Sequence, residues 1–262
     1  MPHPEHQAIA ATVRGWFTYS APEMGYFKEE RRWGVYGRHA SAGNEMIIRN
    51  LAPDEVDAFL ADARAYFQGD PARLYIEDSA LDARVSPALA AHGWPCVEAQ
   101  SYLAHVGEPP PVSAVPGVTV EDVTEATLPL WVETKLRGFR DDDALPDMAT
   151  IQTQEAIRRA ELADVGRFRL ARVDGDPAAV LGWYEDSDRF IFNLATRAPY
   201  RMRGIARSLL TAFLAESATR GARSTLINAD VAGTSINLYH RLGFTDEVYW
   251  RAKYEPLSRP AA

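Results

Sequence analysis

The chain has 262 residues, of which 47% are hydrophobic and 24% are charged, and its formal net charge at pH 7 is −8. This composition is typical of a globular protein with one large or two modest domains, and it lacks the run of ~18 apolar residues that spans a membrane. The acidic balance argues against nucleic acid as a partner, because phosphate backbones are bound mainly by Lys and Arg. A single cysteine, Cys96, and an N-terminus without a signal peptide predict a cytoplasmic location.

The N-terminal half carries one clear amphipathic helix. Its apolar residues recur at helical spacing: Val56, Phe59, Leu60, Ala63 and Phe67. After it, the proline-rich segment 108–116 favours extended backbone and is the best linker in the chain. We therefore expect two domains, at residues 1–107 and 117–258.

The C-terminal half alternates between strand and helix patterns. Strands are expected at 118–120, 168–173, 179–184, 190–196, 224–228 and 248–254, and helices at 127–139, 147–163, 205–218 and 234–242. The apolar face of the third helix comprises Ile205, Leu209, Leu210, Phe213, Leu214 and Ala218. A mostly antiparallel meander followed by helix, strand, helix and strand predicts a mixed α/β fold.

The junction between the 190–196 strand and the helix after it is the most informative stretch. Its turn contains Gly204, which lets a ligand approach the backbone closely. The first amides of a helix have no intrahelical acceptor and carry partial positive charge, so such a junction can bind a pyrophosphate. Arg201, Arg203 and Arg207 add positive charge in an otherwise acidic protein.

Two motifs carry a resemblance to a known family. Arg201-x-x-Gly204-x-Ala206 resembles the Gln/Arg-x-x-Gly-x-Gly/Ala motif of the GNAT (Gcn5-related N-acetyltransferase) superfamily. The preceding Leu194-Ala195-Thr196 resembles the splayed strand whose backbone pairs with the pantetheine arm of the cofactor. About 35 residues on, the segment from Asn237 to Phe244 resembles the family's later motif, in which a helix ends at a Gly-Phe pair. The resemblance covers residues 117–256.

The resemblance implies an N-acetyltransferase in which a primary amine attacks acetyl-CoA directly in a ternary complex. Tyr239 matches the position of the family's acid, which protonates the leaving thiolate. The resemblance also implies the cofactor-binding residues, which are Leu194, Ala195, Thr196, Arg201, Met202, Arg203, Gly204, Ile205, Ala206, Arg207 and Asn237. The amine acceptor is not identified by the sequence, and the chain is expected to be a monomer or a homodimer.

The general base is left open, because some family members carry a glutamate on the strand that here reads 190–194 without a carboxylate. Either a carboxylate elsewhere or a chain of waters to solvent takes the proton. Glu185, Asp230 and the acidic loop 141–143 are the candidates for the first alternative, and each also fits a solvated surface group.

The N-terminal half resembles a degenerate copy of the C-terminal half. Gly69–Ile76 aligns with Gly221–Asn228, and Gly93-Trp94 with Gly243-Phe244. The connection between strand and helix is nine residues shorter in the first copy, and Asp54 and Glu55 lie where the second copy has arginines and glycine. Carboxylates there would repel a pyrophosphate, so we expect a scaffold without a cofactor site.

The sequence leaves a second function open, a non-catalytic acyl-CoA-binding or regulatory module. Other nucleotide folds are disfavoured, because neither Gly-x-Gly-x-x-Gly nor Gly-x-x-x-x-Gly-Lys occurs. No metal site is expected, since the six histidines are scattered and there is no second cysteine.

Overall fold

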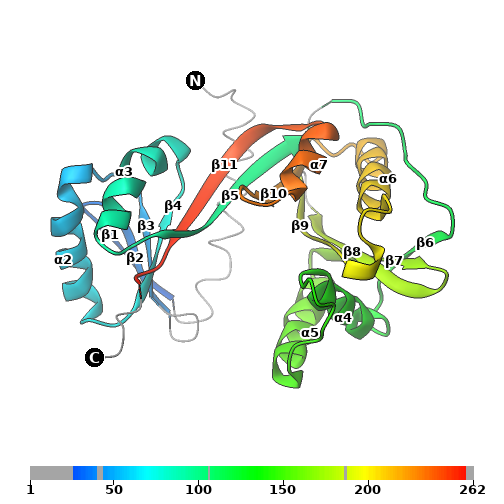
Figure 1. Cartoon of the computed structure of the whole chain (residues 1–262), viewed down its shortest axis with the longest axis horizontal. Helices are drawn as coiled ribbons and strands as arrows, with labels where there is room; N and C mark the ends of the chain where they lie inside the picture. The colour runs from blue at the N-terminus through cyan, green and yellow to red at the C-terminus, as the bar shows by residue number, and fades with distance from the viewer. Residues whose placement is uncertain (1–25, 40–43, 106, 186–187, 258–262) are drawn as a thin grey trace. The chain divides into compact units, whose positions relative to one another are not determined.

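The computed structural model describes residues 26–39, 44–105, 107–185 and 188–257 (Figure 1). The described residues fall into two compact units. Unit 1 holds residues up to 102 together with 229–236 and 247–257, and unit 2 holds 103–228 and 237–246. No described helix is both long enough and apolar enough to cross a membrane.

Unit 1 is a mixed sheet with two helices. Its elements are β1 (Tyr26–Arg31), β2 (Gly34–His39), β3 (Asn44–Ile48), η2 (Pro53–Glu55), α2 (Val56–Phe67), β4 (Ala72–Ile76), α3 (Ser79–Ala91), most of β5 (Cys96–His105) and the end of β11 (Phe244–Tyr254). β1, β2 and β3 pair antiparallel, β3 and β4 pair parallel, and β4 pairs antiparallel with β11. All five apolar residues predicted for the first helix are buried in its core.

The strand that follows β4 in the unit 1 sheet comes from the end of the chain. Ala252 of β11 pairs with Ile76, and both Ala252 and Tyr254 are fully buried in the core of this unit. The Tyr254 hydroxyl donates to the carboxylate of Asp82 on α3. The compact units are therefore built from discontinuous segments and do not coincide with the domains expected at 1–107 and 117–258. Those domain bounds remain a proposal.

Unit 2 contains the antiparallel meander expected from the sequence. Its elements are β6 (Val118–Asp122), α4 (Leu128–Gly138), α5 (Met148–Ala163), β7 (Gly166–Val173), β8 (Asp176–Glu185), β9 (Arg189–Thr196), η3 (Ala198–Tyr200), α6 (Ile205–Thr219), most of β10 (Thr225–Asp230), α7 (Ser235–Arg241) and the start of β11. β6 to β9 pair antiparallel in sequence order, and β9 pairs parallel with β10.

Helices cover the unit 2 sheet with the apolar faces that the periodicity predicts. Trp131 of α4 is completely buried, and its indole nitrogen donates to the carbonyls of Arg169 (3.0 Å) and Leu181 (3.3 Å). On α6 the predicted face is buried except for Ala218, which is exposed because the buried face continues through the neighbouring Ser217 in the last turn.

The same succession occurs in both parts of the chain. Two antiparallel strands lead into a helix and a parallel strand, as β2-β3-α2-β4 and as β8-β9-α6-β10. Each is followed by a helix and a further strand, α3-β5 and α7-β11. The α/β class with mixed, mostly antiparallel pairing is confirmed.

Candidate active site

Strand β9 separates from its parallel neighbour β10 partway along its length. Their pairing runs from Thr225 and Arg189 to Ile227 and Ile191 and stops there. On its other side β9 stays paired with β8 as far as Thr196. The last residues of β9 therefore have an edge with no strand partner in the described parts of the chain. Open backbone groups of this kind can pair with an extended, amide-containing ligand.

A β-bulge lies at the point where the two strands separate. Gly182 of β8 pairs with Asn193, but the next residue, Trp183, pairs with Ile191, so Phe192 has no opposite residue. The Phe192 ring stacks on Tyr184, with ring centroids 4.2 Å apart. Bulges redirect side chains and recur beside functional sites.

The loop after β9, residues 197–204, is called the phosphate loop below. Its tip is Met202, which has a φ of 60° and is fully solvent-exposed. Gly204 has a φ of 80°, which a side chain adopts only at a cost, and a Cβ there would meet only Val115, at 3.5 Å. The conformation, rather than crowding by the protein, explains the glycine and leaves its surface open to a ligand.

Helix α6 begins without a side-chain cap. Its N-cap is Gly204, which offers no acceptor, whereas Asp78 caps α3 and Asp147 caps α5 by accepting bonds from the amides of Leu81 (2.6 Å) and Thr150 (2.9 Å). The first amides of α6 are left for another acceptor, and the helix dipole favours an anion there. Helices α2 and α4 also lack a side-chain cap, but they start at Glu55 and Thr127, whereas α6 starts at a glycine.

The three arginines of the motif differ in what they contact. Arg201 is engaged by Asp141 and by backbone carbonyls. Arg203 lies over the ring of Tyr200 at 5.6 Å, and Arg207 is exposed on the first turn of α6. Within the described residues neither Arg203 nor Arg207 has a carboxylate partner, so these two carry the charge that a pyrophosphate can use.

The second motif lies on α7 in the same unit. Asn237 is exposed, and Tyr239 is buried with its ring edge-on to Phe244, at 6.2 Å between centroids. Gly243 has a φ of 90°, and a Cβ there would be 3.1 Å from the ring of His105. Both conformation and close packing thus require the glycine that ends this helix.

The structure does not bring Glu185 to the phosphate loop. Glu185 pairs with Arg189 at the first residue of β9, about 23 Å along the strand from Thr196. Its carboxylate forms ion pairs with Arg189 (2.9 Å), Arg220 (3.2 Å) and Arg167 (3.4 Å). Glu185 is therefore not placed to act as the base, because it is both distant and paired.

The other candidate carboxylates are also engaged. Asp142 binds Arg140, and the pKa of the Asp142 carboxyl is held well below its usual range by that guanidinium. Asp141 binds Arg201, and Asp143 binds Arg197. Asp230 accepts a bond from the amide of Ala232 at 3.0 Å. The water-mediated route for the proton is the alternative that this geometry favours. Among the described residues no cluster of side chains could hold a metal ion.

In unit 1 a carboxylate occupies the start of the helix that corresponds to α6. Glu55 accepts a bond from the amide of Ala52 at 3.2 Å and pairs with Arg32. The Ala52 amide, the largest influence, lowers the pKa of the Glu55 carboxyl. The chain itself thus places a carboxylate at this helix start, and the lack of a cofactor site in this half stays a prediction.

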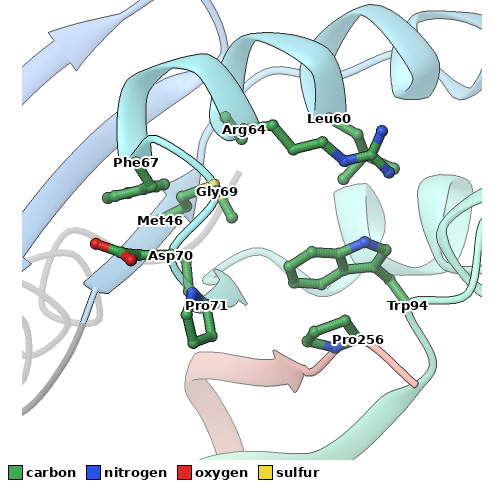
Figure 2. A pocket seen from close by; sticks show the side chains of 11 residues that line it. Met46, Leu60, Arg64, Phe67, Gly69, Asp70, Pro71, Trp94 and Pro256 are labelled. Atoms are coloured by element: carbon green, nitrogen blue, oxygen red, sulfur yellow. The ribbon is translucent and has the colours of Figure 1, made fainter. Parts of the chain in front are cut away.

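Unit 1 also has a pocket of about 180 Å³ at the opposite end of α2 (Figure 2). Phe67 and Leu60 of α2 face Trp94 and Pro256 across it. This pocket adjoins the turn after α2, and not the start of the helix, so it does not correspond to the cofactor position of the other copy.

A strand that leaves its neighbour, followed by an uncapped helix start, is an arrangement that can accept a phosphate-bearing cofactor. Residues 128–244 match the model of the Acetyltransferase (GNAT) family, which is the family that the two sequence motifs of this segment resemble. GNAT acetyltransferases use acetyl-CoA, which is the cosubstrate of this domain. Comparison with curated proteins gave no match.

Solved structures share the fold over most of the chain. A GCN5-related N-acetyltransferase from Kribbella flavida is 16% identical, with 97% of this chain and 96% of that chain covered and a TM-score of 0.60. One from Sphaerobacter thermophilus is 16% identical, with coverages of 87% and 81% and a TM-score of 0.61. A tandem GNAT protein from the clavulanic acid biosynthesis pathway is 14% identical, with coverages of 88% and 81% and a TM-score of 0.56.

Proposed function

We propose that the protein is an N-acetyltransferase that moves the acetyl group of acetyl-CoA to a primary amine, either of a small molecule or of a protein, by direct attack in a ternary complex. The observation that carries this proposal is the uncapped start of α6 directly after the separation of β9 from β10. This junction supports the proposal because it has an unpaired strand edge that could pair with the pantetheine arm and a helix start that could accept the pyrophosphate.

The cofactor is proposed to lie along β9 and across the start of α6. The backbone of Leu194, Ala195 and Thr196 would pair with the pantetheine amides, because this edge has no strand partner among the described residues. The amides of residues 202–207 would hold the pyrophosphate, with the guanidinium groups of Arg203 and Arg207 adding charge.

The chemistry then requires two protons removed from the nitrogen and one proton delivered to the sulfur. The ammonium form of the amine loses one proton to water, and the neutral nitrogen attacks the thioester carbonyl, so a C–N bond forms. The tetrahedral intermediate then collapses, the C–S bond breaks, and the nitrogen loses its second proton to water. Tyr239 donates its phenolic proton to the departing thiolate and regains one from solvent. Orientation of the two substrates supplies much of the acceleration, so no covalent enzyme intermediate is needed.

The alternative is a non-catalytic acyl-CoA-binding module. Every carboxylate that the sequence suggested as a base is engaged, which is the observation that favours this alternative. The enzyme is preferred because a water-mediated route needs no carboxylate. A cytoplasmic location and a monomeric or homodimeric state remain predictions.

Calorimetric titration of acetyl-CoA, with desulfo-CoA and ADP as comparison ligands, tests the cofactor site. We expect one site per chain, because the start of α2 carries the Glu55 carboxylate and lacks the glycine and arginines found at the start of α6. Two sites per chain would contradict the degenerate copy, and no binding would refute the cofactor site. An amine screen that follows release of the free thiol then separates the enzyme from the binding module.

Two glutamate variants at opposite ends of α6 make the titration specific. Gly204→Glu introduces bulk and negative charge at the proposed pyrophosphate site and should weaken binding by at least about a hundredfold. Gly221→Glu is the matched control, since Gly221 has a φ of 73° and open space around it. It should bind within about threefold of the wild type. Equal affinities for the two variants would refute the loop assignment.

A further inference from the structure

Two arginines of the phosphate loop, Arg197 and Arg201, point their side chains toward the loop between α4 and α5. Arg197 binds Asp143 through two parallel bonds, Nε to Oδ1 at 3.0 Å and Nη2 to Oδ2 at 2.6 Å. Its third nitrogen, Nη1, donates to the carbonyl of Pro177 at 2.8 Å. Both charged side chains are less than a fifth exposed, and bidentate pairs of this kind fix geometry as well as supply energy.

Every nitrogen of the Arg201 guanidinium also donates a hydrogen bond. Its Nε donates to the carbonyl of Thr196 (3.1 Å), its Nη2 to the carbonyls of Gly138 (3.0 Å) and Arg140 (2.9 Å), and its Nη1 to Asp141 (2.5 Å). The Gly138 and Arg140 carbonyls lie at the C-terminal end of α4, where carbonyls lack intrahelical donors and the dipole favours a cation. Arg201 therefore caps α4 from the phosphate loop.

The end of α4 also lies directly against the end of β9. A Cβ at Gly138 would be 2.8 Å from the Cβ of Ala195 and 3.3 Å from the backbone nitrogen of Thr196. The close approach and the arginine contacts together join the α4 end to the strand edge on which the pantetheine arm is proposed to lie.

We propose that Arg197 and Arg201 are positioning residues that couple the α4–α5 loop, residues 139–147, to the phosphate loop and so set the amine-acceptor side of the site. In this role Arg201 is not a phosphate ligand, although it is the first residue of the phosphate-binding motif. The inference rests on the proposed function, because it takes the α4–α5 loop to border the acceptor.

The coupling follows from where the backbone and side chain of Arg201 lie. Its backbone belongs to the phosphate loop, between Tyr200 and the strained Met202, while its guanidinium is committed to the end of α4. Any change in the loop when it binds phosphates is transmitted to the carbonyls of Gly138 and Arg140. Arg203, one residue beyond Met202, lacks such contacts and is free to bind the ligand.

Hydrogen exchange on the full chain, with and without desulfo-CoA, tests the coupling. In the wild type we expect ligand to slow exchange in the peptide covering 139–147. Arg201→Gln should raise the ligand-free exchange of that peptide about tenfold, as expected for the loss of a charge-assisted contact, and should keep the affinity for desulfo-CoA within about threefold. Arg203→Gln is the matched control. It should leave the ligand-free exchange of that peptide unchanged and should weaken desulfo-CoA binding.

The variant Asp143→Asn keeps the shape of the side chain and removes its charge, so it tests the other contact of the proposed coupling, that with Arg197, without altering the phosphate loop. We expect it also to raise exchange in 139–147. With an amine from the screen, Arg201→Gln should raise the KM for the amine about tenfold and leave the KM for acetyl-CoA within about threefold.

Unchanged exchange in both Arg201→Gln and Asp143→Asn would overturn the inference, as would a loss of desulfo-CoA affinity in Arg201→Gln equal to that in Arg203→Gln. Failure of the wild type to bind desulfo-CoA would instead refute the proposed function and, with it, transmission from the cofactor. The ligand-free comparison would still show whether the arginines hold the loop.

Discussion

Substitution of Gly138 by alanine should disturb both the stability of unit 2 and its affinity for CoA. The added Cβ would lie 2.8 Å from the Cβ of Ala195, a separation at which one of the two elements must move. Neither contact partner is the end of a flexible side chain, so the strain must be taken up by α4 or by the strand end that is proposed to bind pantetheine.

The size of the effect can be bounded from this geometry. Overpacking costs ~1–3 kcal/mol, and replacing glycine by alanine in a helix returns at most ~1 kcal/mol. Gly138 is the last residue of α4, so that return is smaller here. A net loss of about 1–2 kcal/mol should lower the melting temperature by about 2–8 °C.

The double variant Gly138→Ala with Ala195→Gly is the compensating control, because it removes the Ala195 Cβ that the new Cβ would meet. Calorimetric melting with and without CoA should show a loss in Gly138→Ala that is partly recovered in the double variant, with a coupling of about 1 kcal/mol. Wild-type melting and CoA affinity in the single variant would refute the reasoning, as would a double variant no better than the sum of the two singles.

Three further predictions concern single side chains. Tyr239→Phe should lower kcat by about ten- to a thousandfold without weakening acetyl-CoA binding, and unchanged turnover in a rapid-quench assay would remove Tyr239 from the mechanism. Glu55→Gln should leave the calorimetric stoichiometry at one acetyl-CoA per chain, because neutralising this carboxylate supplies neither the glycine nor the arginines of a phosphate loop; a second site would contradict this. Burial and nearby Arg158 lower the pKa of Lys135 to about 8, whereas Glu161 raises it less. Between pH 8 and the unfolded value of 10.5 the unfolded chain holds a proton that the folded chain has lost, so stability from this group rises with pH, by at most ~1.4 kcal/mol per unit. Lys135→Met should abolish that rise in urea-unfolding midpoints, and a retained slope would show that another group titrates.

Local patterns predicted the elements that depend on local physics. Apolar periodicity predicts helices α2 and α6, and turn chemistry predicts Gly204 and Gly243, because helical spacing and positive φ are readable over a few residues. Ala218 is the exception on α6, because the buried face of the last turn includes the polar Ser217, which apolar spacing does not reveal.

The partners of charged groups could not be predicted in this way. The acidic loop 141–143 was considered as a source of the base or as a solvated surface, yet Asp143 binds Arg197 across 54 positions of the sequence. Glu185 is one of the candidate bases in the sequence, but the register of β8 and β9 places it opposite Arg189, at the end of β9 away from the phosphate loop. Such pairings are set by the tertiary fold and leave no periodic signal.

The final strand contributes core residues to both units. Phe244, at the start of β11, is fully buried beside Tyr239 in unit 2, while Ala252 and Tyr254 are fully buried in unit 1 and pair with β4. Loss of unit 1 would leave Tyr254 without its core, and burial of one such aromatic residue is worth about 2–3 kcal/mol. It would also leave the backbone of the strand without its antiparallel partner, and an unpaired edge promotes aggregation. Because one strand holds core residues of both units, we expect removal of the N-terminal half to destabilise the strand whose first residue is buried in unit 2.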